Sequence, residues 1–442
     1  MKNQAKKLTP EMIEKFDQDF LKDKSALLAG RSIAKNGFLA SSEDPSASSR
    51  NNMTFSIEVP TGKVTNQRHS GRCWLFAMLN TLRQEFSQKH HVKDFEFSQN
   101  YSFFWDRLGR ANLFLQRAIE SADKDIDDRY VMSYLSYTMD DGGEWDNAAA
   151  LVETYGVVPS YVMPDTHNTM NTHEFDQINA SLQRKDALEL RKMVRTGQAE
   201  EEIEKRRQEM LSEIYRLCVL AFGQPPKTFD LEFKDDKGNF HQDLDITPQD
   251  FFKNYVNVNL DDYVELVDYP DHEYNHIYWN EMQDNVAGSF QTEYVNVDFK
   301  YLEQAAIDQL KDGHIVWFGC DVDIDSDARK RGWLDDKLYQ PDQLIGIDYK
   351  MNKKERLQTR QGSASHCMAI TGVNLVNGKP TRWKVENSWG PEIGTDGYLS
   401  MTESWFKKYC FQVVANKKYL PKEVQEVLKT KPIKVEPWDT LY

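Results

Sequence analysis

Long apolar runs are absent from this sequence of 442 residues. No stretch approaches the roughly eighteen consecutive apolar residues that a membrane-spanning helix needs. The opening segment, "MKNQAKKLTPEMIEKF", also holds no apolar stretch of signal-peptide length. We therefore expect a cytoplasmic protein that does not engage a membrane.

Cysteine is scarce and scattered. The five cysteines form no CxxC pair and lie at positions 73, 218, 320, 367 and 410. An odd, widely spaced set does not build the disulfide framework of small secreted domains, and it fits a reducing compartment better.

Positive charge is in deficit. The chain has 55 Lys and Arg against 70 Asp and Glu, which gives a net charge of −15, and it contains no basic run. This balance argues against nucleic acid as a partner. A hydrophobic content of 40% with 12% aromatic residues is enough for globular cores, and the length favours two or three packed units.

The texture of the sequence changes along the chain from helical to β-rich, which predicts an α+β fold with its cleft between two lobes. We divide the chain into a Ser/Asn-containing N-terminal arm, a helical lobe, a largely helical insertion, a β-rich lobe and a C-terminal arm, at 1–60, 61–180, 181–290, 291–420 and 421–442.

One part of the insertion, the charge-dense stretch 182–222, carries apolar residues at seven-residue spacing, Ile203, Met210 and Leu217. A solvated helix with one apolar stripe is the simpler interpretation. An oligomer or inter-domain contact is the alternative.

Cys73 directly precedes an apolar helical run, within "TNQRHSGRCWLF" at 65–76. If Ser70 is the N-cap, Cys73 falls in the first helical turn, where free N–H groups and the helix dipole favour a thiolate. Arg72 adds positive charge nearby. The alternative is a buried, inert thiol at the start of a helix.

Acyl transfer by a thiolate also needs a base, a group that orients the base, and donors for the oxyanion. Gln67 can supply an amide donor beside the backbone N–H of Cys73. His366 opens "SHCMAI" and Asn387 opens "NSWG". An Asn amide that accepts from one imidazole nitrogen would leave the other facing the thiol. His69 has no evident orienting partner and is expected to face solvent.

These motifs resemble those of the papain-like cysteine peptidases. The stretch 70–74, "SGRCW", is similar to the C-G-S-C-W signature, and "NSWG" to the family's Asn segment. Ser70 replaces the first cysteine of the signature. His366 follows Cys73 at about twice the spacing of secreted members. Together with "QRHSGRCWLF", "DGGEWDNA" and "PWD", this length resembles the bleomycin hydrolase and bacterial aminopeptidase C family over essentially the whole chain.

The resemblance implies a papain-like two-lobed core, one lobe helical and one β-barrel-like, with a helical insertion and two terminal arms. It also implies a homohexamer whose active sites face an internal chamber, short peptides as substrates, and no cofactor or metal. It assigns the oxyanion donor, nucleophile, general acid/base and orienting residue to Gln67, Cys73, His366 and Asn387.

The resemblance further implies contacts with the substrate. Trp389 would shield the Asn–His hydrogen bond. Gly142 and Gly143 match a glycine pair that lets a substrate backbone lie alongside the enzyme, for which an ordinary turn is the alternative.

The C-terminal arm decides the expected specificity. In this family it lies in the cleft, and its carboxylate anchors the free α-amine of a substrate. Here Tyr442 would supply that carboxylate, and Pro437 would keep "VEPWDTLY" extended. This predicts a cysteine aminopeptidase that acts through a thioester acyl-enzyme. Only three residues follow "PWD", so an oligoendopeptidase with a short arm is the alternative.

A competing motif is "HEYNH" at 272–276, which fits the HExxH signature of zinc peptidases. That chemistry needs His272 and His276 on one face of a helix, with Glu273 as base. The surroundings lack an apolar helical stripe, and no partner motif marks a third ligand. Zinc catalysis is therefore a remote alternative. A binding protein that keeps the fold without activity is another, against which the complete constellation argues.

Overall fold

The computed structural model describes residues 6–441. Its longer helices are α1 (Pro10–Lys22), α2 (Lys24–Asn36), α5 (Cys73–His90), α6 (Gln99–Glu120), α7 (Arg129–Ser136), α8 (Trp145–Tyr155), α10 (His173–Arg195), α11 (Glu200–Phe222) and α13 (Phe299–Lys311). The shorter ones are α3 (Phe38–Ser41), α4 (Ala47–Arg50), α9 (His167–Met170), α12 (Pro248–Phe251), α14 (Pro341–Ile345), α15 (Lys353–Gln358), α16 (Glu403–Tyr409) and α17 (Lys422–Val427). None of the helices within 6–441 is long and apolar enough to cross a membrane.

The strands of the chain are β1 (Ile57–Glu58), β2 (Phe229–Lys234), β3 (Phe240–Ile246), β4 (Tyr263–Val267), β5 (His276–Trp279), β6 (Glu293–Asn296), β7 (Val316–Cys320), β8 (Ser326–Asp327), β9 (Trp333–Leu334), β10 (His366–Val376), β11 (Lys379–Glu386), β12 (Tyr398–Thr402), β13 (Cys410–Asn416) and β14 (Ile433–Lys434). β2 and β3 form a separate hairpin, and the others form one sheet of 12 strands in the order β14-β5-β6-β4-β13-β7-β10-β11-β12-β9-β8, with β1 on β10.

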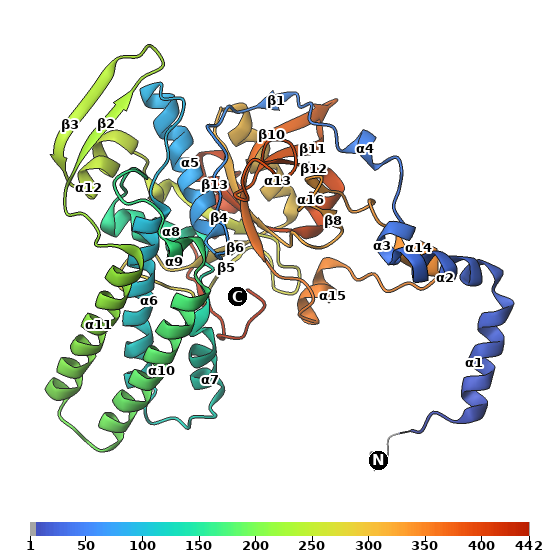
Figure 1. Ribbon diagram of the computed structural model, residues 1–442, viewed down its shortest axis with the longest axis horizontal. Coiled ribbons are helices and arrows are strands. Elements are labelled where there is room, and N and C mark those ends of the chain that lie inside the picture. The colour runs from blue at the N-terminus through green and yellow to red at the C-terminus, as the bar shows by residue number, and fades with distance from the viewer. Residues whose placement is uncertain (1–5, 442) are drawn as a thin grey trace.

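The two lobes lie side by side (Figure 1), and each has a hydrophobic core. The first collects the buried faces of α5, α6, α8, α10 and α11, and the second lies between the large sheet and α13. α5 is buried along most of its length because it lies between α6 and α8 on one side and β7 and β10 on the other. The α+β fold with two lobes is the one that the sequence predicted.

The stretch 182–222 is divided between two helices, α10 and α11, joined through Gly197, whose φ of +70° favours glycine, and the apolar stripe lies on α11. Ile203, Met210 and Ile214 are buried in the helical core, where α11 packs against α6. The stripe is therefore an internal contact of the chain.

The structure differs from the expected helical insertion after Phe222. There the chain forms the β2–β3 hairpin and then β4 and β5, which join the large sheet. Leu266 and Val267 are fully buried in that sheet. A strand covered on both faces shows no apolar-polar alternation, so its sequence carries little strand signal. The C-terminal arm was expected to be extended, but it begins with a short helix, α17.

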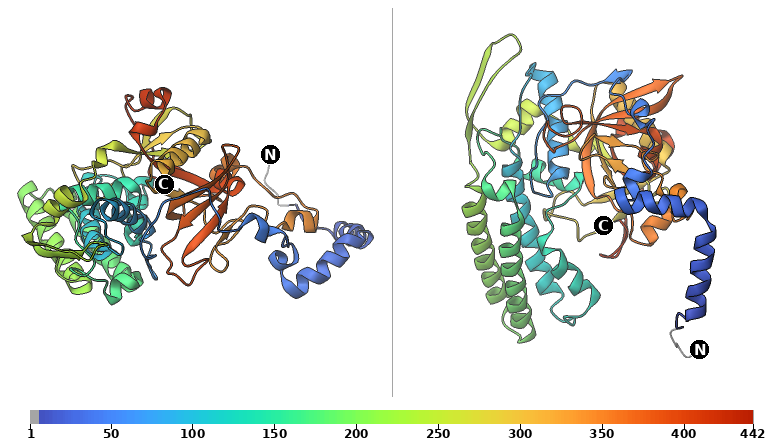
Figure 2. Two further views of the ribbon diagram at one scale, coloured as in Figure 1. Left: turned by 90° about the horizontal axis from the view of Figure 1, so that it is seen from above. Right: turned by 45° about the vertical axis from the view of Figure 1, so that its right-hand side comes forward.

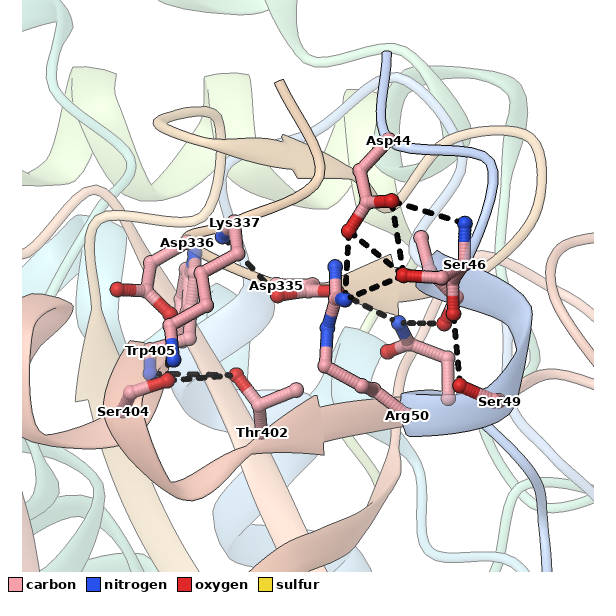
Figure 3. A network of polar contacts seen from close by, with 12 residues as sticks. Asp44, Ser46, Ser49, Arg50, Asp335, Asp336, Lys337, Thr402, Ser404 and Trp405 are labelled. Carbon is pink, nitrogen blue, oxygen red and sulfur yellow. Dashed lines mark hydrogen bonds and ion pairs between the residues drawn. The ribbon is translucent and has the colours of Figure 1, made fainter. Parts of the chain in front are cut away.

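The N-terminal arm crosses to the β-rich lobe and is attached there by α4 (Figure 3). Arg50 pairs through its Nη1 with Asp44 at 2.6 Å and donates from Nε to Asp335 at 3.0 Å. Asn51 donates to the same carboxylate of Asp335, which is fully buried. Beyond this attachment α1 projects away from both lobes (Figures 1 and 2).

Candidate active site

The nucleophile candidate is the first residue of α5, whose N-cap position is Arg72 rather than Ser70. The expected Ser70 cap is wrong because α5 begins at Cys73 and the Ser70 hydroxyl closes the preceding loop, where it donates to the Gln67 carbonyl oxygen at 2.7 Å and accepts from Nε of Arg72 at 3.0 Å. Cys73 nevertheless lies at the helix start, where backbone N–H groups have no partner within the helix and the dipole favours an anion.

The charge of Arg72 is directed away from the thiol. Its guanidinium is fully buried, pairs with Asp165 at 3.1 Å and donates to the carbonyl oxygen of Thr169 at 2.5 Å. Arg72 therefore fixes the loop before α5, and its charge is compensated by Asp165.

An imidazole lies at the other side of the cleft, at the start of β10. Nε2 of His366 lies 2.8 Å from Oδ1 of Asn387, which follows β11. Because an amide oxygen only accepts, Nε2 carries the proton and Nδ1 is left as the nitrogen that can face the thiol. The Trp389 ring stacks on His366 with centroids 4.7 Å apart. Trp389 thereby covers the His366 imidazole, whose orientation Asn387 fixes.

The pKa of Cys73 lies well below its ordinary value. A hydrogen bond with the Cys367 thiol lowers it most, burial opposes the shift, and the charge of His366 and a hydrogen bond with it lower it further. Burial raises the pKa values of the other four cysteines, which like Cys73 lie in the described part of the chain. Cys73 is thus the thiol that is activated as a nucleophile.

A lowered pKa means that the thiolate persists as the pH falls. We expect iodoacetamide to alkylate Cys73 at pH 6 almost as fast as at pH 8, whereas a free thiol with a pKa of about 8.5 slows roughly eighty-fold over that interval. Mass spectrometry of the Cys73 peptide measures the rate. In His366→Ala the profile should move toward that of a free thiol. A wild-type profile parallel to that of free cysteine would contradict the lowered pKa of Cys73 and its stabilisation by the charge of His366.

Gln67 lies between the two lobes, beside the nucleophile. Its backbone N–H donates to the Ser388 carbonyl oxygen at 2.8 Å, and its side-chain Nε2 donates to the Ser70 carbonyl oxygen at 2.6 Å. A carboxamide nitrogen carries two N–H groups, so one fixes the side chain and the second remains as an oxyanion donor.

A cavity of about 520 Å³ joins these groups, and its lining includes Gln67, Cys73, Gly142, Gly143, His366 and Trp389. His69 is exposed and also lines this cavity. Asn387 is buried behind His366. The structure therefore brings the sequence-derived candidates together around one cleft, apart from Tyr442, which lies outside the described residues.

The glycine pair belongs to a loop held against the nucleophile helix. The Asp141 carboxylate accepts from the Gly71 N–H at 2.6 Å, and its carbonyl oxygen accepts from Nε1 of Trp74 at 3.0 Å. A Cβ on Gly143 would lie 2.8 Å from the Trp74 ring. Glycine is thus required at 143 for the loop to approach Trp74 this closely, and both glycines line the cavity.

Three residues of the site were missed by sequence reasoning. Cys367 hydrogen-bonds with the nucleophile, Asp141 holds the loop before it, and Glu144 lines the cavity. Burial raises the pKa of Glu144 to about 8, although Gln412 donates to its carboxyl oxygen at 3.1 Å. The only available signal was their position next to His366 or within "DDGGE".

The C-terminal arm shares a hydrophobic cluster with the wall of this cavity. Leu441 is buried in a cluster that contains Tyr269, Leu357 and Phe411. Ala364 packs against the same cluster and also lines the cavity. The last described residue of the arm is therefore linked to the cavity wall through this cluster.

The HExxH segment does not form the helix that zinc catalysis needs. Asp271 and His272 lie in a turn, and His276 begins β5. The His276 ring contacts the Tyr274 carbonyl oxygen, whereas the His272 ring faces the C-terminal arm. The two histidines therefore serve different parts of the fold.

Known proteins resemble the chain over nearly its whole length. Aminopeptidase G of Lactobacillus delbrueckii subsp. lactis is 47% identical over 98% of this chain and 99% of its own. Aminopeptidase E of Lactobacillus helveticus is 46% identical over 99% and 100%. A crystal structure of pepw from Lactobacillus rhamnosis matches with a TM-score of 0.96 at 42% identity, covering 98% of each chain. Residues 7–442 match the Peptidase C1-like family. The chain therefore belongs to the Peptidase C1-like family, as the motifs around Cys73 and Asn387 predicted.

Proposed function

We propose that this protein is a cysteine aminopeptidase that removes N-terminal residues from short peptides. The observation that carries the proposal is the activated thiol of Cys73 in one cavity with the His366–Asn387 pair. The names of the relatives, aminopeptidases G and E among them, agree with this activity.

The groups of the site suffice for a two-step acyl transfer. The Cys73 thiolate attacks the carbonyl carbon, and the oxyanion accepts hydrogen bonds from Nε2 of Gln67 and the backbone N–H of Cys73. The His366 imidazolium gives its proton to the leaving amine, which leaves a thioester on Cys73. A water molecule then attacks the thioester while His366 takes its proton, and the acid departs.

The C-terminal arm explains a preference for N-terminal residues. Leu441 lies in the hydrophobic cluster against which Ala364 of the cavity wall packs, which places the arm near the space that a longer substrate would need. The terminal carboxylate would pair with the α-ammonium of the substrate, a charge-assisted contact that an acylated amine forfeits. If the arm stops short of the reacting centre, internal cleavage becomes possible, and the oligoendopeptidase remains the second candidate.

Truncation after Asp439 tests the role of the arm. We expect the intact chain to prefer an aminoacyl fluorophore over its N-acylated counterpart, and the truncated chain to lose that preference, because the carboxylate and Leu441 are removed together. The ratio of the two kcat/KM values measures it. Efficient cleavage of the acylated substrate by the intact chain would make the enzyme an endopeptidase.

For assembly we propose a cytoplasmic homohexamer. All residues of α1, which lies wholly within the described range, are exposed, and they include Met12, Ile13, Phe16 and Phe20. An apolar helix face of this kind gains by packing against another copy. Light scattering should give six times the 51.5 kDa of the chain. A monomer at micromolar concentration would contradict the proposal.

A further inference from the structure

The C-terminal arm first follows the large sheet and then leaves it. β14 pairs in parallel with β5, with Ile433 opposite Tyr278, and the Val435 N–H donates to the Trp279 carbonyl oxygen at 2.9 Å. A turn follows, in which the Asp439 N–H donates to the Glu436 carbonyl oxygen at 2.9 Å. Beyond this turn the arm needs other contacts to keep its direction.

His272 makes these contacts. Its Nε2 lies 2.9 Å from Oδ1 of Asp439, and its Nδ1 lies 3.2 Å from Oδ1 of Asp271. The other oxygen of Asp271 accepts from the Thr440 hydroxyl at 2.6 Å. The Asp271–His272 turn therefore contacts two consecutive residues of the arm.

An imidazole between two carboxylates interacts favourably with both only as the cation, because the neutral ring has a single N–H. Burial alone would lower the pKa of His272, but the interactions with Asp271 and Asp439 outweigh it and raise the pKa to about 9. The three side chains are mostly shielded from solvent, with 15% of His272, 6% of Asp271 and 23% of Asp439 exposed. Such pairs are screened less than surface ion pairs.

The same carboxylate directs the end of the arm. Oδ1 of Asp439 also accepts from the Leu441 N–H at 3.0 Å, and Leu441 is buried in the cluster against which Ala364 of the cavity wall packs. A continuous set of contacts thus connects His272 through Asp439 to the arm residue next to the cleft.

Contacts elsewhere hold the preceding part of the arm independently. Nη2 of Arg360 donates to the Trp438 carbonyl oxygen at 2.7 Å, and the Arg129 guanidinium lies 4.0 Å from the centre of the Trp438 ring. Loss of the His272 contact should therefore release 439–441 while β14 and Trp438 stay in place.

We infer that His272 is a positioning residue of the peptidase: with Asp271 and Asp439 it clamps the end of the C-terminal arm at the cleft. This role rests on the proposed function of the arm. It also explains a motif that the catalytic chemistry leaves unused, since His272 comes from "HEYNH" and binds a segment of the chain itself.

The test compares His272→Ala and Asp439→Asn with the control His276→Ala, which changes the other histidine of the motif and leaves the arm contacts intact. Asp439→Asn removes the charge but keeps an oxygen for the Leu441 N–H, and it lies near the chain end where misfolding is not a concern.

Two readouts are needed. Hydrogen exchange reports the protection of 439–441, and the ratio of kcat/KM for free-amine and N-acylated substrates reports the effect on specificity.

We expect His272→Ala and Asp439→Asn to increase deuterium uptake in 439–441 and to lower the free-amine preference at least tenfold. The double variant should add little to either, and neither change should matter in a chain truncated after Asp439. His276→Ala should resemble the wild type in both readouts.

Different results identify which proposal fails. Unchanged protection of 439–441 in His272→Ala would overturn the clamp, even if truncation abolishes the free-amine preference and so supports the proposed function. A truncated chain that keeps its preference would refute the role of the arm in specificity, and with it the positioning role of His272.

Discussion

Cys73→Ala should abolish peptidase turnover while the protein stays folded. Removal of the nucleophile of a catalytic unit costs on the order of 10⁶ in kcat. The fold should tolerate the change, because the side chain shrinks by one sulfur at the edge of a cavity and α5 keeps its buried residues Trp74 and Leu75. Hydrolysis of an aminoacyl fluorophore measures the loss, and circular dichroism checks the fold.

Cys218→Ala is the matched control for the loss of a thiol. Cys218 is buried in the core between α11 and its neighbours, does not line the active-site cavity, and has a pKa raised by burial to about 12. This variant should keep its kcat even if its stability falls. Activity retained in Cys73→Ala but lost in His272→Ala, together with inhibition by a chelator, would instead establish the zinc mechanism.

Gln67→Ala should lower kcat by roughly 10²–10³, the usual cost of losing one oxyanion donor. KM should change little, because the donor acts on charge that develops in the transition state. Asn387→Ala should be milder, since His366 remains present and loses only the partner that orients its ring. Steady-state kinetics of the two variants separate these effects.

The control for this prediction is Gln67→Glu, which keeps the shape of the side chain but replaces the N–H donor by an acceptor. It should be at least as impaired as Gln67→Ala. Near-normal turnover of Gln67→Glu would refute the oxyanion assignment. An equal and complete loss in Gln67→Ala and Asn387→Ala, with an altered circular dichroism spectrum, would indicate misfolding, because the Gln67 side chain also holds the Ser70 carbonyl oxygen.

The sequence by itself determined the class of fold, the family and the residue types of the site. Apolar periodicity after Cys73 predicted α5, and the β-rich texture of 291–420 predicted the strand-rich lobe that contains β7, β10, β11 and β13. These signals are local, because they depend on which face of one segment is buried. The motifs around Cys73 and Asn387 then predicted the family that the comparisons confirm.

The tertiary structure decided every feature that depends on competition between distant groups. The Ser70 hydroxyl could have accepted from N–H groups at the helix start, but its loop instead directs it to donate to the Gln67 carbonyl oxygen and to accept from Nε of Arg72. Arg72 found its counter-ion in Asp165. β4 is a strand because it pairs with β13, which lies far away in the sequence, and β5 is a strand because it pairs with β6. The motif at His272 shows the same principle: its spacing fits a zinc signature, which the sequence left only as a remote alternative, and the partner that the fold brings to His272 is Asp439 of the C-terminal arm. Spacing along a chain specifies a ligand set only when the local helix is formed, and here the chain folds into a turn and a strand.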